Sequence, residues 1–196
     1  MGTNAKKVFI GLADQSSTTG ALARGAVLTT IPADIAAAQT AISSWTTSGY
    51  VSEDGASLST SISTTDIREW NRAAVRRLLE EFDGTVTLTL IQLDGESAKQ
   101  CFGADNVTVT AANATHGEQI HIKLGAHLDA PQGWALRMKD GDMKMIVLIP
   151  NGQVTSGVDI TFAANSAINL PITISANDDG TGESIHIYTD DGVTSA

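Results

Sequence analysis

The sequence predicts a mainly β fold, a sandwich or barrel of about ten strands with one short α-helix and a long extended loop. The first observation is strict alternation: residues 56–63 alternate Ala, Leu, Thr and Ile with serines, and residues 85–90 alternate Thr with Val and Leu. Successive side chains of a strand point to opposite faces, so each stretch covers a core with one face. The second observation is that similar segments recur roughly 8–15 residues apart. No repeat of about 20–50 residues is present, which excludes a solenoid or propeller.

The composition fits one domain spanning residues 1–196. The formal net charge is −10, so we expect the chain to repel nucleic acid rather than bind it. No segment approaches the ~20 apolar residues of a membrane span, and the N-terminus lacks the apolar stretch of a secretory signal. Cys101 is the only cysteine, which rules out an internal disulfide. We therefore expect synthesis in a cytoplasm and no membrane association.

The N-terminal part is expected to form an arm over about residues 1–25. Its alternation predicts a short strand at 7–12, and a second strand follows at 26–31. Asp34 precedes an alanine-rich stretch and can cap a short helix through Ile42, because its carboxylate accepts free amide protons. A loop fits this stretch almost as well.

The connections around the alternating strand at 56–63 are polar. Residues 43–48 read as a loop that holds Trp45, and Glu53-Asp54-Gly55 reads as a turn into the strand. Residues 64–72 read as a long loop that carries Trp70 and charges of both signs.

The stretch 73–82 is ambiguous. Val75, Leu78, Leu79 and Phe82 have the spacing of an amphipathic helix. Against this, Asp83-Gly84 is a turn dipeptide directly before an alternating strand, which favours a β-hairpin at that point.

The C-terminal half reads as one helix followed by strands and turns. Asp94 caps a helix that Gly103 ends, with Ala98, Cys101 and Phe102 as its buried stripe. The stretch 143–149 contains consecutive apolar residues, which indicates a strand buried on both faces. Residues 177–182 read as a hairpin loop. Further strands are predicted at 106–111, 120–124, 134–139, 158–162, 168–174 and 185–187.

The sequence predicts no catalytic, metal or cofactor site. The histidines, His116, His121, His127 and His186, have no Cys or carboxylate at ligand spacing. The stretch 177–180 resembles a calcium loop in composition but lacks its alternating spacing. Cys101 lies on an apolar stripe without a histidine nearby in sequence. Glu80 and Glu81 cannot act as a catalytic pair if adjacent side chains of a strand point apart.

Several stretches, taken in order, resemble the major tail proteins, or tail tube proteins, of long non-contractile-tailed bacteriophages. They begin with GYVSEDG at residue 49 and continue through TTDIREWN, AVRRLLEEFDGTVTLTLIQ, a short helix ending in CFG, and DNVTV. The resemblance resumes at MKMIVLIPNGQVTSGVDITF and ends with DDGTGESIHIY. It covers nearly the whole chain and rests on the order of several modest motifs.

The resemblance implies a tail tube-like sandwich or barrel flanked by a helix, related to the tubes of contractile tails and type VI secretion. It implies hexameric rings joined through sheet edges and stacked into a tube that conducts DNA. It implies partners in the tape measure, tail terminator and tail tip proteins, a place in the virion, and synthesis in a host bacterium. It also implies that 73–82 is a strand facing the channel, hairpinned onto the next strand, and we adopt this reading.

Two groups of residues are candidates for these roles. Glu80, Glu81 and Asp83 are hypothesised to face the lumen, because an acidic wall does not hold DNA. The hypothesised ring-to-ring contact consists of Trp45, Asp66, Arg68, Glu69, Trp70 and Arg72. The alternatives are the tube of a contractile or type VI-like injection machine and, from another class, a β-sandwich binding or adhesion module. An enzyme is the least favoured reading.

Overall fold

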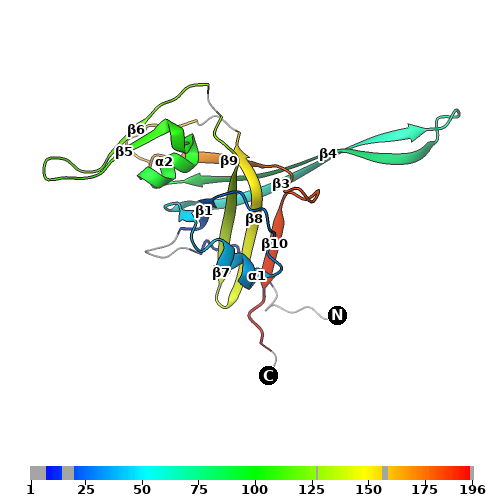
Figure 1. Cartoon of the computed structure of the whole chain (residues 1–196), viewed down its shortest axis with the longest axis horizontal. Coiled ribbons are helices and arrows are strands. Elements are labelled where there is room, and N and C mark those ends of the chain that lie inside the picture. The colour runs from blue at the N-terminus through cyan, green and yellow to red at the C-terminus, as the bar shows by residue number, and fades with distance from the viewer. Residues whose placement is uncertain (1–7, 15–19, 127, 156–158, 195–196) are drawn as a thin grey trace.

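The computed structural model describes residues 8–14, 20–126, 128–155 and 159–194. Within them an 8-stranded sheet and a 2-stranded sheet form a mainly β molecule with two α-helices (Figure 1). The elements are β1 (Leu22–Gly25), α1 (Ile35–Ala41), β2 (Thr46–Thr47), β3 (Val51–Arg68), β4 (Ala74–Leu90), α2 (Gly95–Phe102), the 3-10 turn Ala104–Asn106, β5 (Val107–Thr110), β6 (Gln119–Ile122), β7 (Gln132–Asp140), β8 (Met143–Val154), β9 (Leu170–Ala176) and β10 (His186–Asp190).

The large sheet has the order β2-β1-β7-β8-β9-β4-β3, and β10 also pairs with β8. One edge of β8 pairs with β7, while its other edge is shared, first by β10 along residues 144–148 and then by β9 along 152–154. Figure 1 shows β7, β8 and β10 running across the direction of β3 and β4. The sheet therefore folds over at β8 in the manner of a sandwich and does not close into a barrel, which confirms the predicted fold class.

The central strands are buried on both faces, as the run of apolar residues in β8 predicted. Val147 and Ile149 belong to a core cluster with Leu88, Leu90 and other side chains of β4, β9 and α2. Ile146 and Leu148 point to the opposite side and pack with Ala38 and Ile42 of the α1 region. Because alternate residues of one strand serve two clusters, β8 joins the two layers of the molecule.

Two capped helices flank the sheet, where the sequence predicted only one with certainty. The Asp34 carboxylate accepts the Ala37 N–H at 2.8 Å, so the helix alternative for residues 35–41 is confirmed and the loop alternative is wrong. The Asp94 carboxylate accepts the Ser97 N–H at 2.7 Å and begins α2, and Gly103 ends it. The prediction for α2 is confirmed, including the burial of Ala98 and Cys101.

The longest elements, β3 and β4, form one antiparallel hairpin. Residues 74–82 are strand, so this part of the reading adopted from the resemblance is confirmed and the helical pattern misleads. The implied hairpin onto the next strand is wrong, because β4 continues without a turn to Leu90 and pairs with β3. The apolar residues that created this pattern do not form a buried stripe, since Val75, Leu79 and Phe82 are 68%, 67% and 42% exposed.

The predicted connections of the hairpin are wrong in three places. The loop predicted over 64–72 is strand as far as Arg68, and only residues 69–73 turn. Glu53-Asp54-Gly55 is an irregularity inside β3, where Gly55 takes a φ of +73°, rather than a turn. Asp83-Gly84 lies in the middle of β4, because Gly84 pairs with both Thr60 and Ala176 and Ile185 fills the space above it. A Gly after Asp permits a turn but does not require one.

The predictions for the N-terminal region need correction. Among residues 8–14 only Ala13 forms a bridge, to Met138, so the strand predicted at 7–12 is absent from its described part; Lys7 lies outside the described residues. The strand predicted at 26–31 is also wrong, because the strand lies just before it, at β1. β1 is buried between β2 and β7, so the predicted arm does not extend to residue 25; residues 1–7 and 15–19 lie outside the described part.

Two C-terminal predictions are also wrong. Residues 159–162 form no strand, and Val158 lies outside the described residues. The stretch 177–182 is not a hairpin loop, because β9 and β10 each pair with β8 and not with one another. Alternation identifies a strand but not its partner, which explains the second error.

We predict that Gly133→Ala destabilises the fold. Gly133 pairs with Gly25 across β7 and β1, and the indole of Trp45 lies against both glycines; a Cβ on Gly133 would lie 2.5 Å from that ring. Because the ring is fixed in a core cluster, the free energy of unfolding should fall by about 1–3 kcal/mol. Urea denaturation measures this. Gly117→Ala is the control, since its Cβ would meet nothing within 4 Å; equal losses for the two variants would contradict the prediction.

Candidate functional site

The β3–β4 hairpin projects far beyond the body of the molecule (Figure 1). β4 pairs with β9 along residues 84–90 only, so from residue 83 outward its one partner is β3. We call residues 61–83 the distal hairpin. Within it only Asp66 and Leu78 are half-buried, and every other residue is exposed. The distal hairpin therefore gains little from packing within its own chain.

One face of the hairpin is apolar. Its cross-strand pairs are Leu58 with Val86 and Ile62 with Phe82. Val86, next to the body, is 2% exposed and belongs to the core, whereas Leu58 is 40% and Ile62 64% exposed. The apolar surface thus leaves the core and continues into solvent along the strands. We call it the apolar face.

The other face carries hydroxyl and carboxylate groups, and we call it the hydroxyl face. Its pairs are Ser57 with Thr87, Ser59 with Thr85, Ser61 with Asp83, and Ser63 with Glu81. Between Ser63 and Thr64 the register shifts, because β4 has one extra residue, Glu80, opposite these two.

The extra residue brings the three predicted lumen-facing acids together. The Glu80 carboxylate accepts hydrogen bonds from Thr65 Oγ1 at 2.5 Å and from Ser63 Oγ at 3.4 Å, so it lies on the hydroxyl face. Glu81 and Asp83 lie there through their pairing with Ser63 and Ser61. The expectation that Glu80 and Glu81 point apart is wrong, since a bulge interrupts strand alternation.

The end of the distal hairpin, which we call the tip, carries five of the six residues predicted for the ring-to-ring contact: Asp66, Arg68, Glu69, Trp70 and Arg72. Asp66 accepts from Arg68 Nη2 at 3.2 Å and from Arg77 Nε at 2.9 Å, and the Arg68 guanidinium also donates to the Arg72 carbonyl. Glu69 lies in the same turn. The Trp70 side chain is 100% exposed. The charged groups at the tip therefore order each other and leave one large aromatic ring in solvent.

Trp45 does not belong to this group. Its indole is half-buried, packs with the second core cluster and lies against Gly25 and Gly133. The structure gives Trp45 a packing role, which sequence reasoning missed because the closeness of two glycines on different strands is visible only in the fold.

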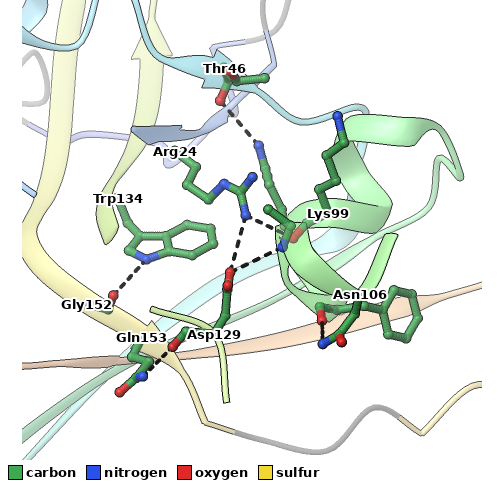
Figure 2. A network of polar contacts seen from close by, with 11 residues as sticks. Arg24, Thr46, Lys99, Asn106, Asp129, Trp134, Gly152 and Gln153 are labelled. Atoms are coloured by element: carbon green, nitrogen blue, oxygen red, sulfur yellow. Dashed lines mark hydrogen bonds and ion pairs between the residues drawn. The ribbon is translucent and has the colours of Figure 1, made fainter. Parts of the chain in front are cut away.

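A buried charge network fixes the opposite side of the body (Figure 2). The Arg24 guanidinium of β1 donates to the Lys99 carbonyl of α2 at 2.9 Å and lies 3.7 Å from the Asp129 carboxylate. It also lies over the Trp134 ring, 6.0 Å from its centroid. Burial lowers the pKa of Arg24, and Asp129 acts in the opposite direction. The network holds α2 and the segment at Asp129 against the sheet.

A cleft of about 860 Å³ opens beside this network. Its walls come from the end of α2, the segment that follows β6, the end of β8 and residues 159–162. Leu124, Leu128 and Phe162 line it and are 78%, 58% and 77% exposed. The cleft therefore holds three large apolar side chains that lack cover within the described chain, and Asn106, Lys123, Thr155 and Asp159 add polar groups to its lining.

The groups considered for metal binding or catalysis lie apart. Among the described residues no three His, Cys, Asp or Glu side chains gather as a metal site; His127 lies outside them. Within the stretch 177–180, the Asp179 carboxylate accepts from Thr181 and from His186 Nε2 at 2.8 Å, and these bonds hold its pKa at about 2. Burial raises the pKa of the Cys101 thiol to about 12, which keeps it protonated.

No helix in the described part is long and apolar enough to cross a membrane.

The fold is mainly β and presents a long hairpin with two different faces. The particular family follows from comparison, because the family described as phage tail tube protein matches residues 1–196. The chain therefore belongs to the phage tail tube proteins, which are components of the virion tail. A search of curated proteins finds no match.

We predict that Asp129→Asn lowers the free energy of unfolding by about 2–4 kcal/mol, because it leaves the buried Arg24 charge without its carboxylate. Thermal and urea denaturation measure the loss. In the double variant Arg24→Met/Asp129→Asn the loss should be smaller than the sum of the single losses, since no charge stays unpaired. Arg77→Gln, which breaks an exposed ion pair, serves as control and should change little. Strict additivity in the double variant would show that the pair does not interact.

Proposed function

We propose that the protein self-assembles into stacked hexameric rings that form the tube of a long, non-contractile phage tail. The tube delivers DNA, and the protein has no enzymatic activity. One observation carries the proposal: the hairpin has an apolar face that extends the core and an opposite face of hydroxyls and acids. A strand pair with two such faces suits a wall that packs against protein on one side and meets DNA on the other.

The apolar face packs against neighbouring copies in the ring. Leu58, Ile62, Leu79 and Phe82 form an exposed apolar strip that a solitary soluble chain would normally cover. Burial of such side chains contributes roughly 25 cal/mol per Å², so association removes an unfavourable contact with water.

The outer edge of β3 supplies a second contact surface between copies. β3 ends the order of the large sheet, so one side of this 18-residue strand has no partner in the described chain. Its sequence contains no proline or lysine, the residues that commonly protect an edge from pairing. Strand addition at this edge joins one copy to the next, and the same contact repeated around an axis closes a ring.

The hydroxyl face lines the lumen. The hydroxyls of Ser57, Ser59 and Ser61 offer a polar surface without charge, and Glu80, Glu81 and Asp83 add negative charge to it. Such a wall repels phosphates and lets DNA pass without being held. The tape measure protein occupies the same lumen during assembly, and the tail terminator and tail tip proteins bind the two ends of the tube. Synthesis takes place in the host cytoplasm.

Electron microscopy of the purified protein at rising concentration tests the proposal, and two matched variants sharpen it. Ile62→Glu places a charge on the apolar face and should abolish rings and tubes. Ser61→Glu, its neighbour on the hydroxyl face, should still assemble, because the new charge points into the lumen. Circular dichroism verifies that both variants fold. Loss of assembly in both variants, or in neither, would exclude the proposed assignment of faces.

The lumen assignment makes a separate prediction. The triple variant Glu80→Lys, Glu81→Lys and Asp83→Lys reverses three charges and should form tubes of normal diameter that retain duplex DNA at low salt. Retention is measured by co-sedimentation and should disappear as salt rises. The control, Glu53→Lys/Asp54→Lys/Asp105→Lys, reverses three acids outside the distal hairpin. Equal retention by both triple variants would place Glu80, Glu81 and Asp83 outside the lumen.

A further inference from the structure

The hairpin tip has two features that are typical of a residue group that anchors a protein interface. Trp70 is 100% exposed, although an indole exposed in water is unfavourable and tryptophan is frequent among the residues that anchor protein interfaces. The tip residue Arg72 has a φ of +68°, a conformation that glycine or asparagine adopts more easily. An arginine held in this conformation suggests that its side chain is needed at the tip.

The charge of the tip is positive where the chain as a whole is negative. Arg68 and Arg77 share Asp66, whereas Arg72 and Arg76 form no ion pair with another described residue. The tip therefore offers an aromatic ring beside two available guanidinium groups.

The cleft beside α2 has matching chemistry. Its apolar lining residues are Phe102, Leu124, Leu128 and Phe162, and Lys123 and Asp159 lie among its polar ones. Its volume of about 860 Å³ lies within the range of roughly 300–1,000 Å³ that holds sizeable ligands. Asp159 is exposed at the cleft and pairs with no described cation. An indole could enter among these apolar side chains with an arginine facing Asp159.

The tip and the cleft cannot meet within one chain. Figure 1 shows the hairpin tip at one end of the long axis and α2 with β6, which border the cleft, at the other end. A copy displaced along the direction in which the hairpin projects brings its tip toward the cleft of the next copy. A contact between two different surfaces repeats without limit, which is what a stack of rings requires.

We propose that the cleft beside α2 receives the hairpin tip of a second copy, with Trp70 seated among Leu124, Leu128 and Phe162 and Arg72 facing Asp159. This inference rests on the proposed function, because it assigns the receptor of the contact between successive rings. It gives α2 and the Arg24–Asp129 network a role in assembly: they hold one wall of the receptor in place.

A mutant cycle tests the contact through the lowest concentration at which tubes form. Trp70→Ala should raise this concentration at least about tenfold, as expected for an interface anchor, and Phe162→Ala should raise it in the same direction. The double variant should be no worse than Trp70→Ala, because both changes remove one contact. Ile187→Ala is the control; this residue is 53% exposed and lines another cleft, so its effect should be small. Independent, additive effects of the two changes would overturn the inference.

Disulfide trapping identifies the partner surface directly. Tubes grown from an equal mixture of Asn71→Cys and Phe162→Cys chains should give a covalent dimer that contains both variants. A mixture of Asn71→Cys and Ile187→Cys should not, and the buried Cys101 should stay reduced. Tubes that form normally without the Asn71–Phe162 product would overturn this inference and leave the proposed function intact. A wild-type chain that never forms rings or tubes would overturn both.

Discussion

The antiparallel register between β3 and β4 is the constraint on which the rest of the molecule depends. The inner part of β4 supplies Val86, Leu88 and Leu90 to the main core, while its outer part has no partner except β3. The same backbone ladder thus anchors the body and carries the distal hairpin into solvent. Because neighbouring strands share faces in register, the side that is apolar in the core remains apolar outside it.

The body behaves as a platform that fixes this hairpin. β8 contributes side chains to both core clusters. β9 pairs with β4 along residues 84–90 and so fixes the hairpin to this core. On the far side, the Arg24 guanidinium ties β1 to the end of α2 and to Asp129. A buried ion pair of this kind stabilises less than its charge suggests, since both ions lose water. The Arg24–Asp129 pair instead fixes the end of α2 and the segment at Asp129 relative to the sheet.

The sequence predicted the fold class, both helix caps and most strands, because alternation and capping are local properties. The errors concern long-range pairing. Asp83-Gly84 has the composition of a turn, yet Gly84 lies between two strands and beneath Ile185. The helical spacing of Leu79 and Phe82 has a specific cause: the extra residue Glu80 places both on the apolar face although they are three positions apart. A strand with a bulge therefore imitates helical periodicity.

The candidate site was predictable only in part. The tip residues were found because they are polar, charged and adjacent in sequence. Three features depend on distant segments and were missed: the grouping of Glu80, Glu81 and Asp83 on one face, the packing of Trp45, and the cleft beside α2.

The bulge at Glu80 also has a genetic consequence. Deletion of the single codon for Glu80 would restore strict alternation and leave Leu79 on the apolar face, because Leu79 already pairs with Thr64, the residue next to the partner of Glu81. The extra residue therefore adds a carboxylate to the hydroxyl face, and it can be lost without changing the face of any side chain beyond it.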